Sequence, residues 1–111
     1  MRAIVVGMGV QGNKRKNFLG KDFVYPVDKF KKADFQSISK VPLNKFDTVF
    51  ACVPDSQKLK IVNYCINNKK HVIIVYGGVN STDFGSAARV YWTFKTLGHD
   101  EVSILNGGYK A

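Results

Sequence analysis

The stretch that decides the fold lies near the start of the chain, where a run of apolar residues leads into three glycines: Ala3-Ile4-Val5-Val6-Gly7-Met8-Gly9-Val10-Gln11-Gly12. Residues 3–6 are small or β-branched and predict a buried strand. The next six residues follow the pattern G-x-G-x-x-G, and residues 13–19 predict a helix that ends near Gly20. A strand, a glycine-rich turn and a helix in this order are typical of a βα unit that receives the phosphates of a dinucleotide.

Strands and helices alternate along the rest of the chain. The sequence predicts further strands at 23–27, 48–53, 72–76 and 102–105, and helices at 56–68 and 86–97. Pro26 cannot donate a ladder hydrogen bond, so its strand is expected near an edge of the sheet. Residues 37–39 are a candidate for a very short extra strand. We therefore expect an α/β fold with three αβα layers, a doubly wound parallel sheet of about five strands that is Rossmann-like or flavodoxin-like, in the order 2-1-3-4-5, or 3-2-1-4-5-6 if the extra strand pairs.

The helix expected at 56–68 carries a periodic apolar face. The residues predicted to be buried on it are Leu59, Ile61, Val62, Cys65 and Ile66. Before it, Pro54, Asp55 and Ser56 provide a break in the strand followed by N-cap chemistry.

Length and composition fit one domain that covers residues 1–111. The chain is 45% hydrophobic and has no apolar run long enough to span a bilayer, so no membrane partner is expected. Cys52 and Cys65 fall in segments predicted to be buried and lack metal-ligand spacing. We therefore expect no disulfide, no metal and a cytoplasmic location.

The charge balance favours anionic partners without selecting one. Seventeen basic and eight acidic residues give a net charge of +9. No recognition helix or zinc-finger motif accompanies them, so nucleic-acid binding beyond non-specific attraction is not expected. The expected partner is a dinucleotide or another small molecule that carries phosphate. The chain is expected to be a monomer or a homodimer that buries Trp92.

Each glycine of the turn has its own predicted role. Gly7 permits the tight turn, Gly9 lets the backbone approach a pyrophosphate, and Gly12 lets the helix pack closely on the strand. The N–H groups at the helix start, from Val10 and Gln11 onward, would then bind the anion. The same glycines also fit a tight βα turn that holds no ligand.

A carboxylate for the ribose follows at a suitable distance. Asp28 comes 16 residues after Gly12, at the end of the strand predicted at 23–27. This is near the place where an acid accepts the 2′-hydroxyl of NAD. Lys29 and the pair Lys31 and Lys32 would instead attract the 2′-phosphate of NADP, so both cofactors stay open. Asp28 also fits a loop-capping role.

Three segments in the first two thirds of the chain share a family pattern: residues 3–12, Asp47-Thr48-Val49-Phe50-Ala51-Cys52-Val53-Pro54 and Lys69-Lys70-His71-Val72-Ile73. On these, residues 1–73 resemble the NAD(P)-binding Rossmann half of the glucose-fructose oxidoreductase and inositol dehydrogenase superfamily. The resemblance implies NAD or NADP as cofactor, with contacts on the nicotinamide side from Val53 and Pro54. In that family the strand runs into Glu-Lys-Pro, whose lysine serves the chemistry. This chain reads Ile74-Val75-Tyr76-Gly77-Gly78 and has no such lysine.

The last third of the chain carries a different pattern: Val75-Tyr76, Ser86-Ala87-Ala88-Arg89-Val90-Tyr91-Trp92, Leu97-Gly98-His99 and Val102-Ser103-Ile104-Leu105-Asn106-Gly107-Gly108-Tyr109. Residues 74–111 resemble a segment of the rhodanese, or thiosulfate sulfurtransferase, family. The resemblance implies a persulfide-carrying cysteine at the start of the loop after the Val-Tyr strand. Gly77 stands there instead.

The two patterns meet inside one predicted strand without a linker. This suggests a chimera in which two half-folds share one sheet, arising by engineering or by natural fusion. Since neither catalytic group is present, the sequence predicts a non-catalytic scaffold that retains a dinucleotide phosphate-binding loop, with weak affinity. The alternatives are a fragment of an NAD(P)-dependent oxidoreductase and a basic nucleic-acid-binding domain.

Overall fold

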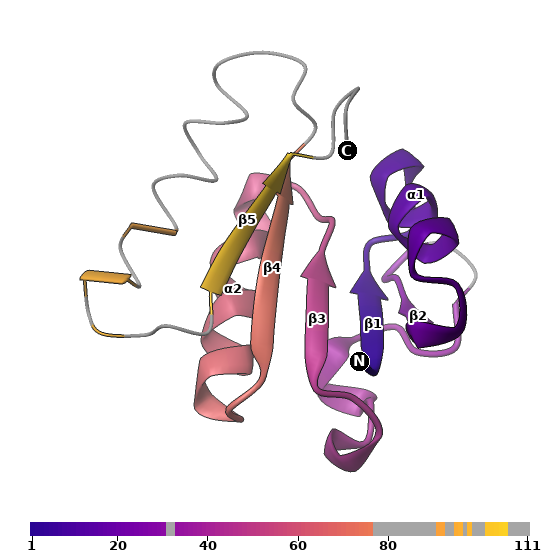
Figure 1. Cartoon of the computed structure of the whole chain (residues 1–111), viewed down its shortest axis with the longest axis horizontal. Helices are drawn as coiled ribbons and strands as arrows, with labels where there is room; N and C mark the ends of the chain where they lie inside the picture. The colour runs from indigo at the N-terminus through magenta and orange to yellow at the C-terminus, as the bar shows by residue number, and fades with distance from the viewer. Residues whose placement is uncertain (31–32, 77–90, 93–94, 97, 99–101, 107–111) are drawn as a thin grey trace.

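Five parallel strands form one open sheet in the order β2-β1-β3-β4-β5 (Figure 1). The computed structural model describes residues 1–30, 33–76, 91–92, 95–96, 98 and 102–106. The strands are β1 (Ala3–Val6), β2 (Phe23–Val27), β3 (Thr48–Ala51), β4 (His71–Tyr76) and β5 (Val102–Asn106). The predicted Rossmann-like α/β fold and the order 2-1-3-4-5 are confirmed.

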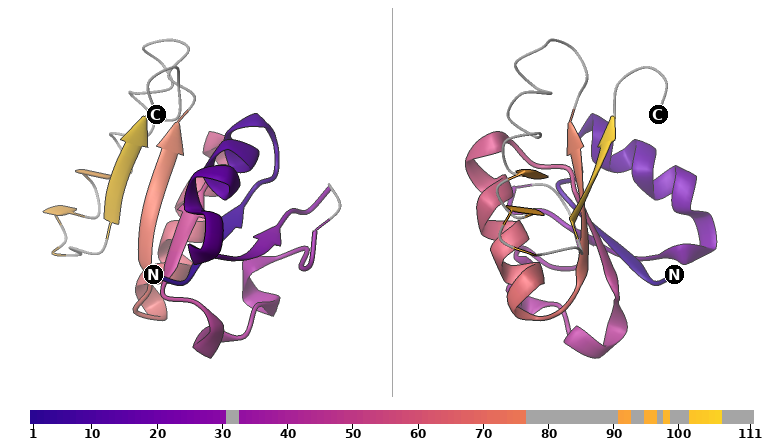
Figure 2. Two further views of the ribbon diagram at one scale, coloured as in Figure 1. Left: turned by 45° about the vertical axis from the view of Figure 1, so that its right-hand side comes forward. Right: turned by 60° about the vertical axis from the view of Figure 1, so that its left-hand side comes forward.

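Two helices cover opposite faces of this sheet. Figure 2 shows α1 (Val10–Leu19) and α2 (Asp55–Asn67) on either side of the strands. Because successive strand residues point to opposite faces, β1 contributes to both layers. Val5 belongs to the apolar cluster that contains Leu19 of α1, whereas Ile4 belongs to the larger cluster that contains Val62 of α2. The predicted three-layer αβα arrangement is therefore confirmed.

Strand β2 lies at the edge of the sheet, as Pro26 predicts. It pairs with β1, where Pro26 lies opposite Val5. On its outer side the described residues add only an isolated bridge between Val27 and Phe35. The expected extra strand at 37–39 is wrong, because Ile38–Lys40 form a 3-10 turn (η2). The Ser37 hydroxyl accepts a hydrogen bond from the Ser39 N–H, which satisfies locally a donor that a strand would have used. The order 3-2-1-4-5-6 is therefore excluded.

Strand β4 is an interior strand. It pairs with β3 on one side and with β5 on the other, so Ile74 lies between Ala51 and Ile104. This strand contains the junction expected between residues 73 and 74. Its neighbours therefore come one from each side of that junction.

Several element boundaries differ from the predicted ones. β3 ends at Ala51 rather than at residue 53, although the Cys52 N–H still donates to the Val6 carbonyl at 2.8 Å. Helix α1 begins at Val10 instead of residue 13. Helix α2 has Pro54 as its N-cap residue and no side-chain cap hydrogen bond, so the expected capping chemistry is wrong. Of its predicted buried face, Ile61, Val62 and Cys65 are buried and Ile66 is half-buried, whereas Leu59 is 48% exposed.

The predicted helix at 86–97 lies mostly outside the described residues. Residues 91, 92, 95 and 96 are helical, and Gly98 has a φ of 88° and donates to the Lys95 carbonyl at 3.0 Å. Trp92 is exposed and Tyr91 packs against the core. The described residues of this segment therefore agree with the predicted helix.

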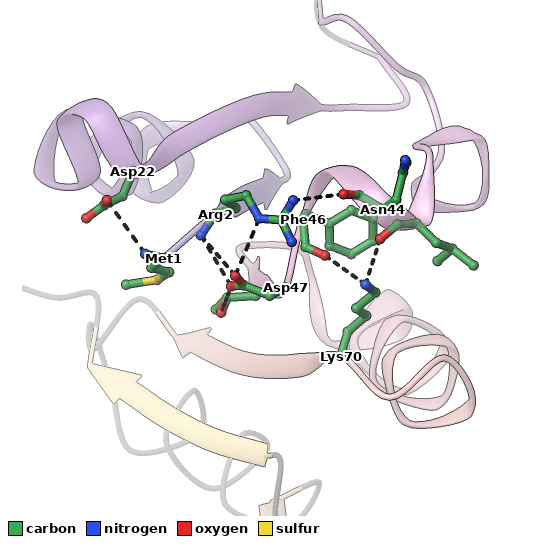
Figure 3. A network of polar contacts seen from close by, with 9 residues as sticks. Met1, Arg2, Asp22, Asn44, Phe46, Asp47 and Lys70 are labelled. Atoms are coloured by element: carbon green, nitrogen blue, oxygen red, sulfur yellow. Dashed lines mark hydrogen bonds and ion pairs between the residues drawn. The ribbon is translucent and has the colours of Figure 1, made fainter.

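A polar network ties together the amino ends of the strands (Figure 3). The Arg2 N–H, just before β1, donates to both carboxylate oxygens of Asp47, just before β3, at 3.3 Å. Lys70, just before β4, donates through Nζ to the carbonyls of Leu43 and Phe46 at 2.6 and 2.8 Å. This edge is held by the chain's own groups, which leaves the opposite, carboxyl edge as the place to seek a site.

Candidate functional site

The carboxyl ends of β1 and β3 form the switch point of the sheet. From β1 the chain enters α1 on one face, whereas from β3 it enters α2 on the other. Crevices at such points are where open α/β sheets bind ligands. The glycine-rich turn follows β1 directly, so the structure places the predicted turn at the switch point.

Gly7 and Gly12 are required by packing. Gly7 has a φ of +95°, and a Cβ there would overlap the Cys52 carbonyl oxygen and lie 2.8 Å from its carbon. A Cβ on Gly12 would overlap the Gly7 carbonyl oxygen. The first glycine therefore brings the turn against the end of β3, and the third brings α1 against the turn, which are the roles the sequence predicts.

Gly9 is different, because the fold does not demand a glycine there. Its φ is −77°, and no atom of the described residues lies within 4 Å of the position that a Cβ would occupy. Gly9 is also the N-cap residue of α1, with no side-chain cap hydrogen bond and no acidic residue in the first turn. Open space therefore borders a helix N-terminus whose partial positive charge has no counter-charge in its first turn.

Asp28 lies beside the turn and holds it. Its Oδ2 accepts a hydrogen bond from the Met8 N–H at 2.6 Å, and its Oδ1 accepts one from the Phe30 N–H at 2.8 Å. The Gly7 N–H donates to the Val27 carbonyl at 2.7 Å. The end of β2 is thus tied to the turn. Its carboxylate oxygens are acceptors only, the type of group that a ribose hydroxyl would donate to.

The other predicted contacts occupy different surroundings. Val10 is exposed at the start of α1, and Gln11 is half-buried, with an Oε1 that has no hydrogen-bond partner among the described residues. Val53 is buried and packs beside Gly7, whereas Pro54 is exposed. The structure therefore brings Val53 to the turn and leaves Pro54 at the surface.

Two buried cations near the turn were missed by the sequence analysis. Arg15 is 3% exposed and Lys58 is 4% exposed. Helical spacing gives the signal, because Arg15 comes three residues after the buried Gly12 and Lys58 comes three before the buried Ile61. Both positions belong to the sheet-facing stripes of their helices.

The positive charges of Arg15 and Lys58 both act on the Cys52 thiol. Burial raises the pKa of the Cys52 thiol to about 12, while the charges of Arg15 and Lys58 act to lower it. The thiol is thus protonated at neutral pH and is no nucleophile in that state. Cys52 and Cys65 are both free thiols, and the described residues contain no cluster of three or more metal ligands. No described helix is long and apolar enough to cross a membrane.

No protein-family model matches the chain. Part of it is similar to curated proteins named thiosulfate sulfurtransferase, with 49% identity over 45 residues to that of Cricetulus griseus. The identity is 44% over 50 residues for Rattus norvegicus and 42% over 45 for Gallus gallus. The chain contains a rhodanese-like segment. The similarity covers 40 to 43% of this chain and 14 to 16% of those relatives' length.

The prediction that the chain contains a rhodanese-like segment is therefore confirmed. The chain spans about one seventh of the length of the relatives it matches. A segment of this size carries one or two βα units, which is less than the fold observed here. The glycine-rich turn has to be interpreted from its own geometry.

Proposed function

We propose that the chain is a non-catalytic α/β scaffold that binds the phosphates of a dinucleotide, NAD or NADP, at the turn from Gly7 to Gly12. One observation carries this proposal: Gly9 faces open space in a backbone conformation that any residue adopts. Packing explains Gly7 and Gly12 but not Gly9, and a glycine at position 9 permits the close approach of a ligand to the backbone. The uncapped start of α1 next to it supplies donors for an anion.

The neighbouring groups fit the rest of such a ligand. Asp28 is held against the turn by the bond from the Met8 N–H, and its carboxylate is the type of acceptor that a ribose hydroxyl needs. Val53 borders the turn from the β3 side, where the family resemblance expects the nicotinamide half. The net charge of +9 favours any phosphate-bearing ligand over a neutral one.

The origin that we propose is composite. Residues 1–73 derive from an NAD(P)-binding half and residues 74–111 from a rhodanese segment, joined within β4 into one domain. Two observations support this origin: β4 pairs with strands from both sides of the junction, and the sulfurtransferase similarity is limited to about two fifths of the chain. Each part supplies strands that cover the edge the other leaves open.

Neither parental reaction is expected to survive. The Glu-Lys-Pro lysine is absent, and Gly77 stands where a rhodanese has its cysteine. Burial raises the thiol pKa of both Cys52 and Cys65 to about 12, so neither substitutes for the missing thiolate. A thiosulfate-to-cyanide assay and a polyol dehydrogenase assay should give buffer rates. Turnover above the blank in the second would favour an oxidoreductase fragment instead.

Binding is tested by titrating the protein into NADH and following the nicotinamide fluorescence. Gly9→Asp places a negative charge at the approach, and Gly9→Asn is its matched neutral control. Both are good N-cap residues, so both should fold as stably as the wild type. We expect Gly9→Asp to weaken NADH binding at least tenfold more than Gly9→Asn does, which corresponds to about 1.4 kcal/mol. Equal affinity in the wild type and both variants would refute the site.

A further inference from the structure

Arg15 occupies a buried position of α1 where an apolar side chain would be expected. It lies on the buried stripe of the helix with Gly12 and Leu19, and it is 3% exposed. Its Nε has no hydrogen-bond partner among the described residues, and neither ion pair found among them includes Arg15. Withdrawing a guanidinium from water without a partner costs free energy. The described part of the chain therefore leaves this Nε without the acceptor that would offset the cost.

Gln11 carries a second unpartnered group one helical turn earlier. Its Oε1 is buried and has no hydrogen-bond partner among the described residues. Gln11, Arg15 and Leu19 follow one another at intervals of four residues, and side chains four apart in a helix are neighbours on one face. Helical side chains also lean toward the helix N-terminus, so the Arg15 side chain extends over the turn that holds Gln11. Two unpartnered polar groups thus lie together near the start of α1.

The backbone at the start of α1 presents donors rather than acceptors. Gly9 is the N-cap residue, with no side-chain cap hydrogen bond, and the first turn contains no acidic residue. The carbonyls of Met8 and Gly9 already accept hydrogen bonds from the Asn13 side-chain amide, each at 3.0 Å. The N–H groups of the first turn have no intrahelical acceptor, as in any helix. This end of α1 therefore attracts negative charge.

The Arg15 charge reaches the same end of the helix. Burial is the main cause of the raised pKa of the Cys52 thiol, and the positive charge of Arg15 acts against it. The Cys52 backbone in turn lies against Gly7, because a Cβ on Gly7 would overlap the Cys52 carbonyl oxygen. This agrees with the helix geometry, which directs the Arg15 guanidinium toward the glycine-rich turn.

We infer that Arg15, together with the Gln11 side chain, binds a phosphate oxygen of the ligand and makes the turn selective for phosphate. This inference rests on the proposed function and adds to it a charged side chain that the glycine-rich turn alone does not supply. A phosphate oxygen would give the guanidinium the acceptor that it lacks, through a strong charge-assisted hydrogen bond. The Gln11 amide carries both a donor and an acceptor, so it can bind the phosphate through Nε2 and receive a bond from Arg15 through Oε1.

NADH titration of matched α1 variants tests this role. Arg15→Met should weaken NADH binding at least tenfold, because it removes the charged donor. Lys16→Met removes the same charge from the next, exposed position of α1 and should change the affinity less than twofold. Arg15→Lys keeps the charge but not the planar fork, so its affinity should lie between those of Arg15→Met and the wild type. Gln11→Met should weaken binding about threefold.

The melting temperature without ligand separates binding from folding. Arg15→Met replaces an unpartnered buried cation by an apolar helix former, so it should melt no lower than the wild type. A lower melting temperature and a lower affinity together, neither of them restored in Arg15→Lys, would assign Arg15 a structural role and overturn the inference. Equal losses of affinity in Arg15→Met and Lys16→Met would also overturn it, because they would reduce the effect to net charge.

Inorganic pyrophosphate distinguishes this inference from the proposed function. It should raise the melting temperature of the wild type relative to chloride at equal ionic strength, and Arg15→Met should lose this rise. If NADH binds Arg15→Met as tightly as the wild type but is lost in Gly9→Asp, the dinucleotide site stands and the role of Arg15 is refuted. If pyrophosphate binds through Arg15 and NADH does not bind, the proposed function fails and a free oxyanion is the ligand. A wild type that binds neither probe refutes both.

Discussion

Replacing Gly12 by alanine should loosen α1 from the sheet. The new Cβ would overlap the Gly7 carbonyl oxygen and lie 2.8 Å from its carbon, where ordinary contact begins at 3.4 Å. Both atoms belong to the backbone of a turn that is itself fixed against Cys52, so α1 has to move outward. Overpacking of this kind costs about 3 kcal/mol, while the better helix propensity of alanine returns about 1 kcal/mol. We expect a net loss of about 2 kcal/mol.

Chemical and thermal unfolding measure this loss. A domain of this size should melt about 8 to 12 °C lower. Gly20→Ala serves as a comparison without steric overlap, because Gly20 has a φ of +54° and no atom of the described residues within 4 Å of its Cβ position. It isolates backbone strain, which costs about 1 kcal/mol. If Gly12→Ala melted within 2 °C of the wild type, the close packing of α1 on the turn would be refuted.

Three further changes probe other parts of the account. Asp28→Asn should lose about 1 to 2 kcal/mol of stability, because the charged acceptor of the 2.6 Å bond from Met8 becomes neutral; unchanged urea unfolding would contradict this role. Burial raises the pKa of the Cys65 thiol to about 12 from 9.0, so the unfolded chain loses this proton first as pH rises. Between pH 8 and 10 the wild type should therefore lose about 1 kcal/mol more stability than Cys65→Ala, and parallel pH profiles would disprove it. Lys70→Met should cost about 1 to 2 kcal/mol, because Nζ donates to two carbonyls and lies 4.9 Å from the Phe46 ring; an unchanged melting temperature would exclude this contribution.

The sheet could be predicted from the sequence because its signals are local. Residues 3–6 and 23–27 are the observed β1 and β2 to the residue, and Pro26 correctly placed β2 at an edge. Right-handed crossovers then leave few strand orders. The prediction of an extra strand was wrong because the Ser37 hydroxyl accepts a hydrogen bond from the Ser39 N–H and so competes with strand pairing. The periodicity of apolar side chains does not reveal such a bond.

Hydrophobicity alone did not identify the two buried cations, although their helical spacing agrees with burial. Apolar periodicity predicts that Leu59 is buried, yet Leu59 is 48% exposed and its neighbour Lys58 is buried. The axis of α2 relative to the sheet decides which neighbour is covered, and that angle is a tertiary property. The roles of Gly7 and Gly12 could be predicted because a G-x-G-x-x-G turn after a strand has one geometry. The bond between Asp28 and the Met8 N–H could not, since it depends on how β2 and the turn are placed in space.

The backbone amides of the turn give the most direct measurement. In a ¹⁵N-resolved NMR titration with NADH, the proposed function predicts that the largest shifts occur at Gly9, Val10 and Gln11, with smaller ones at Asp28. The same titration of Gly9→Asp should leave these amides unmoved. Saturating shifts located elsewhere, or no shift at the turn at millimolar NADH, would contradict a phosphate site at the start of α1.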